Sequence, residues 1–168
     1  MLNVSGIMTD QLLSGRDIGG YRFRLICFIN PARDETGAPL TFLPQSRYRN
    51  SRGLKHHSYG HGPFCQFRIP SNLPLEGVYA LLIGNSVCYV GECIQLSKRF
   101  NMGYGQISPR NCFDRGQPTN CKVNQLVLEA GTKGEQVQLW FLETLHRTPI
   151  ESELIRMFNP PWNAQGKV

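Results

Sequence analysis

The stretch from Gly77 to Gly91, GVYALLIGNSVCYVG, constrains the fold more than any other part of this 168-residue chain. It contains two short apolar runs, VYALLI and SVCYVG, separated by the turn-forming pair Gly84-Asn85. Valine, isoleucine and tyrosine favour pleated, half-buried backbone and Gly-Asn favours a compact turn, so the stretch predicts a β-hairpin. Each run carries one tyrosine, Tyr79 and Tyr89, and the hairpin can bring the two phenols near each other on one sheet face.

Positive charge gathers in two parts of the chain. Residues 46–75 contain five lysines and arginines and no acidic residue, and residues 98–122 contain five against Asp114 alone. The formal net charge of the whole chain is +6. Basic tracts on both sides of the hairpin favour contacts with nucleic-acid phosphates, although runs of charge also form ordinary solvated surfaces.

The remaining composition excludes several protein classes. No apolar run approaches the ~20 residues that a membrane helix needs, and the N-terminus has no basic start followed by an apolar core. The six cysteines follow no tight pair spacing, which predicts reduced thiols instead of a disulfide framework. We therefore expect a cytoplasmic globular protein that does not contact a membrane, built as one domain or as a core with an arm.

Periodicity and turn residues predict the other elements. They are strands at 21–30, 62–70 and 137–144, a short amphipathic helix at 92–102 ended by Gly103, and a final helix with Thr148 as its N-cap that stops before Pro160. Residues 123–130 are compatible with a short helix or a strand, and residues 9–15 with a weak start of a helix. Segments 31–44 and 103–124 are expected to be loops, and the second is long enough to be functional.

The basic loop 47–62 leaves three interpretations open. His57, His61 and Cys65 stand at spacings of four, which suggests a zinc site. The intervening glycines and proline prevent the helix that would align these side chains, and no fourth ligand is apparent, so structural zinc is disfavoured. A DNA-contacting loop is the better functional interpretation, and a long polar connection is its alternative.

Five positions together carry a resemblance to a known family. GVY followed at ten residues by YVG resembles the signature of the GIY-YIG nuclease superfamily, with Val in place of Ile at both positions. Arg99 matches the arginine on the helix that follows, and Glu151 and Asn163 match the metal-binding glutamate and the C-terminal asparagine. The resemblance covers roughly residues 75–163. It implies a small α/β (α+β) core, with a short antiparallel β-sheet flanked by helices.

The same resemblance implies two regions. Residues 1–74 would be an N-terminal arm with strands and the basic loop, contributing to DNA binding. Residues 75–165 would be the nuclease core, with a DNA-contacting insertion at about 103–124.

The resemblance also implies a one-metal hydrolysis of DNA. Glu151 would hold Mg²⁺, for which Mn²⁺ can substitute, together with water and the substrate phosphate. Tyr79 would help to activate the attacking water, Tyr89 would assist it or position the phosphate, and Arg99 would stabilise charge at phosphorus. The metal would stabilise the leaving 3′ oxygen and leave 5′-phosphate ends. Asn163 would support the phosphate or a tyrosine, and which tyrosine loses its proton stays open.

Three positions depart from the pattern or have a second interpretation. The family often has His or Tyr four residues after the arginine, where this chain has Gly103, so Tyr104 is expected to substitute. Glu92 stands where the family often has Lys, and would be a second metal contact or an acid at a helix N-terminus. Glu151 is also placed where a capping-box acid would serve only the helix terminus.

The stretch GYGxISPRNCF…TNCKVN resembles the type II restriction-endonuclease branch of the superfamily. This implies a sequence-specific enzyme that acts on double-stranded DNA as a homodimer. A repair, homing or single-strand-specific nuclease and a non-catalytic DNA-binding module are the alternatives. The side chains expected to contact DNA are polar or basic: Arg47, Arg49, Arg52, Lys55, His57, Arg68, Lys98, Arg110, Asn111, Arg115, Gln117, Asn120 and Lys122.

Overall fold

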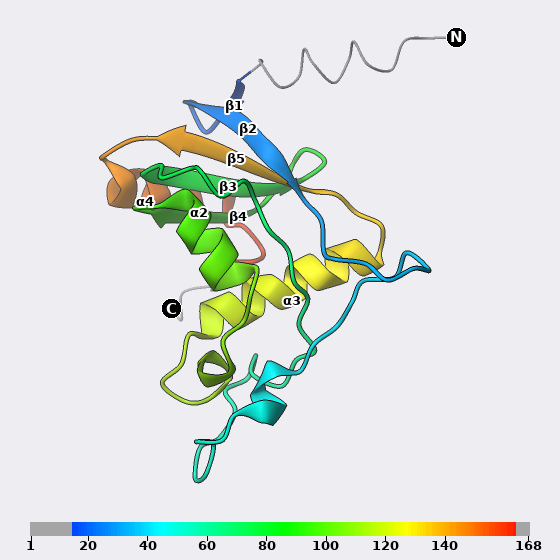
Figure 1. Ribbon diagram of the computed structural model, residues 1–168. Coiled ribbons are helices and arrows are strands. Elements are labelled where there is room, and N and C mark those ends of the chain that lie inside the picture. Colours follow the sequence, from blue (N-terminus) through cyan, green and yellow to red (C-terminus); the bar gives the residue numbers. More distant parts are fainter. Residues whose placement is uncertain (1–14, 164–168) are drawn as a thin grey trace. The chain divides into compact units, whose positions relative to one another are not determined.

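The computed structural model describes residues 15–163 (Figure 1). The described chain divides into two compact units. Unit 1 consists of residues 15–28, 75–94 and 137–163, and unit 2 consists of residues 29–74 and 95–136. This division differs from the predicted arm and core, because the first strands of the chain belong to the same sheet as the predicted hairpin. The weak helix start at residues 9–15 lies outside the described residues, apart from Gly15.

Unit 1 is built on a five-stranded antiparallel sheet with the strand order β1-β2-β5-β3-β4. The strands are β1 (Arg16–Ile18), β2 (Tyr21–Ile29), β3 (Gly77–Ile83), β4 (Ser86–Cys93) and β5 (Val137–Glu143). Two of the predicted strands, those at 21–30 and 137–144, and the hairpin are therefore confirmed. Gly84 adopts a φ of +58° at the β3–β4 turn, a conformation that glycine reaches without strain.

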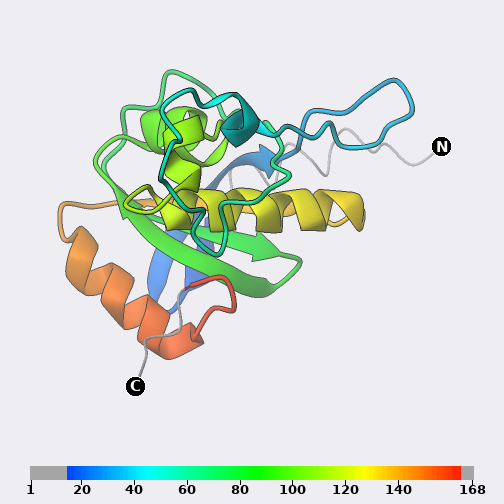
Figure 2. The same cartoon turned by 90° about the horizontal axis from the view of Figure 1, so that it is seen from below.

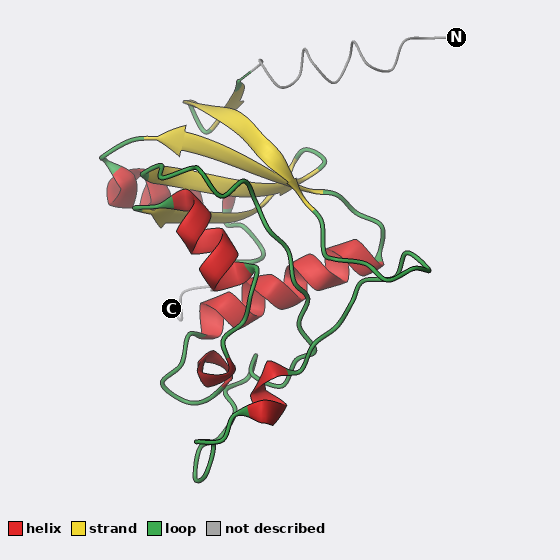
Figure 3. Ribbon diagram, in the orientation of Figure 1, coloured by secondary structure: helices red, strands yellow, loops and turns green. Residues whose placement is uncertain are grey.

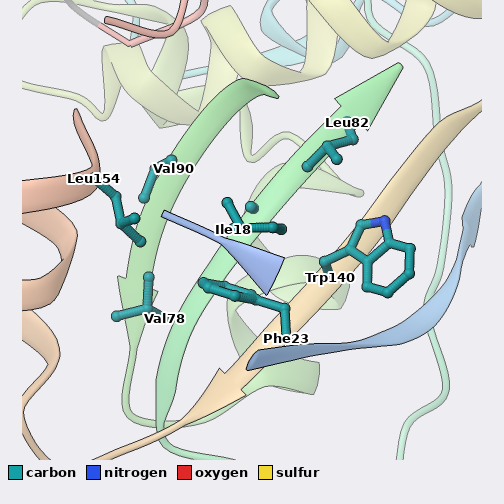
Figure 4. Packing of buried hydrophobic residues seen from close by; sticks show 8 residues of the cluster. Ile18, Phe23, Val78, Leu82, Val90, Trp140 and Leu154 are labelled. Atoms are coloured by element: carbon teal, nitrogen blue, oxygen red, sulfur yellow. The ribbon is translucent and has the colours of Figure 1, made fainter. Parts of the chain in front are cut away.

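The core of unit 1 lies on one face of this sheet. Val78, Ala80 and Leu82 alternate along β3 and pack with Val90 and Trp140, which point to the same side. Ile18 and Phe23 from the β1–β2 hairpin and Leu154 complete the cluster (Figure 4). Leu154 belongs to α4 (Arg147–Phe158), which packs against β3 and β4 (Figure 2).

The start of α4 corrects the predicted helix cap. The helix begins at Arg147, its N-cap position is His146, and no side chain caps it. The predicted cap Thr148 instead donates its hydroxyl to Glu92 at 3.0 Å. Glu151 therefore lies beyond the first turn, and the capping-box interpretation of this acid is wrong. The predicted end before Pro160 is confirmed, and Asn159 leaves the helix at a φ of +43°.

Unit 2 is helical and irregular. Its elements are the 3₁₀ turns η1 (Pro44–Arg47) and η3 (Pro109–Cys112), α2 (Leu96–Arg99), the π-helix η2 (Phe100–Tyr104) and α3 (Pro118–Thr132). Figure 3 draws α2 and η2 as one uninterrupted helix. The predicted strand at 62–70 is wrong: Phe64 makes a single bridge to Phe42, and side chains satisfy much of the remaining backbone of the segment.

Helix α3 replaces the last part of the predicted insertion loop. It begins at Pro118, inside the segment 103–124, and buries Cys121, Val123, Val127 and Ala130. Residues 123–130, which the sequence left between helix and strand, are helical. The sequence hid this helix because its first turns carry Pro, Thr and Asn, residues that favour turns unless tertiary burial intervenes.

None of the helices in residues 15–163 is both long and apolar enough to pass through a membrane. All six cysteines are free thiols, as predicted.

Candidate nuclease site

Tyr79 and Tyr89 lie together on the sheet face opposite the Val78 cluster. The register pairs Tyr79 with Gly91 and Leu81 with Tyr89, so the tyrosines are diagonal neighbours across the two strands. Their ring centroids are 6.2 Å apart and the ring planes differ by 31°. Both side chains are buried, with exposed fractions of 1% and 7%. The predicted meeting of the two phenols is therefore present in the structure.

Both glycines of the tyrosine motifs are required by close approaches. A Cβ at Gly91 would meet the phenol of Tyr79, with Cζ of that ring at 2.5 Å. A Cβ at Gly77 would collide with the carbonyl oxygen of Leu142 on β5. The motif G-x-Y…Y-x-G thus has a packing reason here: Tyr79 lies over the backbone of Gly91, and β5 approaches the backbone of Gly77.

Glu151 is positioned through the first turn of α4. Arg147 donates Nε to Glu76 at 2.8 Å and Nη1 approaches Glu92 at 3.5 Å, which ties the helix start to the beginning of β3 and the end of β4. Residue 151 follows Arg147 by one helical turn and precedes buried Leu154 by three residues, so it is near the sheet-facing side of α4. Glu92 lies in β4, so it is not a helix N-terminal acid, and its role as a second metal contact stays a prediction.

The neighbouring acid on α4 has a different environment. Tyr21 donates its hydroxyl to Glu153 at 2.8 Å. This hydrogen bond raises the pKa of Tyr21, because the neutral phenol is the donor. Glu153 thus links β2 to α4 and serves the fold.

Asn163 holds the outer edge of β4. Its side-chain oxygen accepts the N–H of Val90 at 2.9 Å and its amide donates to the carbonyl of Val90 at 2.8 Å. Trp162 adds a backbone hydrogen bond to the carbonyl of Cys88. Both polar groups of the Asn163 amide thus bind the main chain of Val90, the residue after Tyr89, and its expected support of the phosphate or a tyrosine stays a prediction.

Arg99 and Tyr104 form a close pair in unit 2. Arg99 donates Nη2 to the Tyr104 hydroxyl at 2.7 Å, and its guanidinium carbon lies 4.3 Å from the centroid of that ring. The pair depends on the π-helix, in which the N–H of Gly105 donates to the carbonyl of Phe100 at 2.7 Å. A π turn holds one residue more than an α turn, so Tyr104 occupies the place that a residue four after Arg99 has in an α-helix. The π turn therefore brings Tyr104, and not Gly103, to Arg99.

Asn124 fixes the end of this π-helix, and the sequence analysis did not single it out. It is fully buried in α3 and donates Nδ2 to the carbonyl of Tyr104 at 2.7 Å. The same side chain exchanges two hydrogen bonds with the backbone of Cys65, at 2.9 Å each. A single asparagine inside a helix has no distinctive sequence pattern, so this role of Asn124 could not be predicted from the sequence.

The two units differ in charge. Unit 2 contains twelve Lys and Arg against five Asp and Glu, whereas the described part of unit 1 contains five against six. All thirteen predicted DNA contacts, and the Arg99–Tyr104 pair, belong to unit 2. Tyr79, Tyr89, Glu151 and Asn163 belong to unit 1. Most of the predicted contacts are exposed, including Arg47, Arg49, Arg52, Lys55, Arg68, Lys98, Arg115 and Gln117.

Two of the predicted DNA contacts are used inside the protein. His57 accepts the N–H of Tyr59 at Nδ1 and donates Nε2 to the carbonyl of Asn111, so both ring nitrogens are occupied. Asn120 is 2% exposed and donates to Gln117. We therefore do not retain His57 and Asn120 as DNA contacts. Arg110 donates to the carbonyl of Asp114, and Lys122 lies over the ring of Tyr59. The side chains of Arg110 and Lys122 are both partly exposed.

The acidic residues suit one Mg²⁺ better than a metal held by protein alone. Across residues 15–163, no three His, Cys, Asp or Glu side chains gather closely enough to bind a metal ion by themselves. Magnesium keeps several waters and binds through one or two carboxylates and the substrate phosphate. Half-buried Glu151 on α4 is a carboxylate of the kind that could provide such a contact.

Comparisons with known proteins assign no family to this chain, so the interpretation of the site depends on the residues described above. No model of a known protein family matches the sequence, and no curated protein matches it. Among solved structures, a mutant of EndoII from bacteriophage T4 is similar over 84% of this chain and 90% of its own. The two sequences are 17% identical in that alignment and the TM-score is 0.47. A similarity of this extent assigns neither a family nor an activity to the chain.

Proposed function

We propose that this chain is a Mg²⁺-dependent DNA endonuclease of the GIY-YIG type, which hydrolyses phosphodiester bonds to leave 5′-phosphate ends. The observation that carries the proposal is the pair of phenols, Tyr79 and Tyr89, held 6.2 Å apart over the backbone of a required glycine. Two tyrosines, an arginine oriented by a third phenol, and one carboxylate on the last helix form the set that the sequence motif implies.

Each residue has a role that follows from its chemistry. One tyrosine of the Tyr79–Tyr89 pair, acting as a phenolate, takes the proton of the attacking water and becomes a phenol, and the other tyrosine orients that water or the phosphate. Arg99 supplies positive charge to the phosphorus oxygens, and its guanidinium is held in one orientation by the Tyr104 hydroxyl. Glu151 holds the magnesium ion, which supplies charge neutralisation at the leaving 3′ oxygen when it is bound.

The substrate and its recognition follow from the charge of unit 2. We propose double-stranded DNA, cut at a specific sequence by a homodimer in the cytoplasm, as in type II restriction enzymes. The excess of seven positive charges in unit 2 supports a polyanionic substrate. Exposed arginines and Gln117 are side chains that can reach base edges and phosphates.

Digestion of a large unmodified DNA tests the proposal. In the presence of Mg²⁺ or Mn²⁺ we expect discrete fragments with 5′-phosphate ends, and in EDTA we expect intact DNA. Fragments with a continuous distribution of sizes would support the proposed nuclease activity but contradict the proposed sequence specificity. Intact duplex, single-stranded and branched DNA in the presence of either metal would refute the catalytic function.

A further inference from the structure

A cavity of about 460 Å³ lies in unit 2, and Arg47, one of the predicted DNA contacts, is among its lining residues. Sites that hold small ligands typically have volumes of roughly 300–1,000 Å³. The cavity is lined by the segment 41–47, by residues 64–66 and by Gln106, Ile107 and Pro109. No acidic residue is among these lining residues.

The inner walls of the cavity are apolar and aromatic. Phe42 and Phe64 exchange two backbone hydrogen bonds, at 2.8 and 2.9 Å, so their main chains run side by side. Phe64 and Ile107 are buried, with 1% and 6% of their surface exposed. Leu43 also lines the cavity and is 51% exposed. A flat apolar group is therefore the kind of ligand that these walls fit.

Two amide side chains stand beside each other at the same cavity. Gln66 and Gln106 are exposed, and the N–H of neighbouring Phe67 donates to the carbonyl of neighbouring Gly105 at 3.1 Å. A Cβ at Gly105 would collide with the carbonyl of Phe67, which shows how closely the two segments approach. Side-chain amides carry donors and acceptors in the pattern that pairs with the edge of a nucleobase.

A cation completes the set. Arg47 lines the cavity, ends η1 and is exposed. An arginine at the rim suits a phosphate that is attached to a ligand inside, because its guanidinium donates to two phosphate oxygens at once. The cavity thus has apolar walls, two amides, one arginine and no acidic lining residue. These are the kinds of side chain that a nucleotide site requires.

We infer that this cavity receives one unpaired nucleotide of the DNA, with its base against Phe42 and Leu43 and its edge read by Gln66 and Gln106. The inference rests on the proposed action on DNA and adds a recognition step to it. The occupant is taken out of the stack, because a base that is paired and stacked inside a duplex cannot reach the walls of the cavity. An extrahelical base costs less to capture than a paired one, so the protein should prefer DNA in which one base is already unpaired.

Binding in the absence of metal tests this site. The probes are a duplex with one extrahelical 2-aminopurine nucleotide and the same duplex fully paired, titrated in EDTA with the Glu151→Gln variant so that no strand is cut. We expect the bulged duplex to bind about tenfold more tightly, and the 2-aminopurine fluorescence to change on binding. Equal affinity for the two probes would overturn the inference.

Two variants separate the cavity from the rest of the surface. Gln66→Ala combined with Gln106→Ala should reduce the preference for the bulged probe to within about twofold and leave the affinity for the paired duplex unchanged. Gln136→Ala, at another exposed glutamine of unit 2, is the matched control and should keep the preference. A double variant that keeps the preference would overturn the site.

The binding preference and DNA cleavage can fail separately, so the cavity site and the nuclease proposal are tested independently. A wild-type protein that cuts DNA in Mg²⁺ and shows no preference for the bulged probe refutes the cavity site alone. A protein that shows the preference and never cuts DNA refutes the nuclease alone.

Discussion

The substitution Gly91→Ala is expected to disturb the tyrosine pair, because the new methyl group would meet the phenol of Tyr79, its hydroxyl included. The new methyl carbon would lie 2.5 Å from Cζ and 2.9 Å from Cε2 of Tyr79. Ordinary carbon contacts are about 3.5–4.0 Å, so the ring must move by roughly 1 Å. Gly91 has no positive φ, so its backbone accepts alanine and the cost is steric alone.

The size of the effect follows from the burial of the ring. Overpacking a well-packed core typically costs about 1–3 kcal/mol. For a chain of this length that corresponds to a fall in Tm of about 2–12 °C. A displacement of about 1 Å in a catalytic group lowers the rate on the order of 100-fold. Gly91→Ala should therefore retain its fold and lose most of its DNA cleavage.

A double-mutant cycle identifies the cause. Tyr79→Leu removes Cε2, Cζ and the hydroxyl, which are the atoms that the new methyl group meets. Urea unfolding should show that Gly91→Ala costs about 1–3 kcal/mol in the wild type and much less in the Tyr79→Leu background. Gly103→Ala is the control, because its Cβ would meet Asn120 only at 3.7 Å or more. An equal cost in both backgrounds, or wild-type cleavage by Gly91→Ala, would refute the packing argument.

Three further outcomes are expected. Arg99→Lys should lower single-turnover cleavage on the order of 100-fold with little change in Tm, because lysine keeps the charge but loses the planar group stacked on Tyr104. Asn163→Ala should lower the free energy of unfolding by about 1–3 kcal/mol, since it leaves the edge of β4 without two hydrogen bonds. Burial raises the pKa of the Cys65 thiol to about 12 from an ordinary value of 9.0, so its stabilising contribution is complete below pH 9 and is lost as the pH rises toward 12. The urea concentration at the midpoint of unfolding should therefore fall as the pH is raised from about 8 to about 10.5. It should fall less in Cys65→Ala.

Each of these outcomes has a contrary result. Arg99→Lys with wild-type cleavage would remove the argument for an oriented guanidinium. Asn163→Ala with unchanged stability would mean that the edge of β4 is satisfied in another way. A pH dependence that is the same in Cys65→Ala and the wild type would show that other groups titrate in that range.

The β3–β4 hairpin could be predicted because its determinants are local. Its turn, its apolar runs and its two tyrosines lie within fifteen residues. Its register could not be predicted, because the pairing shifts by one residue between Leu81 and Leu82, and this shift places both tyrosines on one face. The side chains of the motif were nevertheless recognisable, and so was the final helix. Its start was misjudged because Thr148 had two possible hydrogen-bond partners, and the distant Glu92 prevailed over the local backbone.

The parts that escaped prediction depend on contacts between distant residues. The π-helix that brings Tyr104 to Arg99 is fixed by Asn124, twenty residues later in the chain. The same asparagine replaces the strand pairing expected around Cys65, because its amide supplies both backbone partners. Neither arrangement has a local signature, so a sequence pattern predicts a simple helix and a strand at these places.

The central claim is that Glu151, and not its neighbour on α4, serves the reaction. Single-turnover cleavage in Mg²⁺ by Glu151→Gln and by Glu153→Gln tests it most directly, because both changes remove one carboxylate from the same helix. Glutamine at 153 can still accept the Tyr21 hydroxyl, so that variant should cut DNA at nearly the wild-type rate. Glu151→Gln should lose on the order of 1,000-fold or more, as expected for loss of a metal ligand with the fold intact. Equal rates in the two variants would contradict the account.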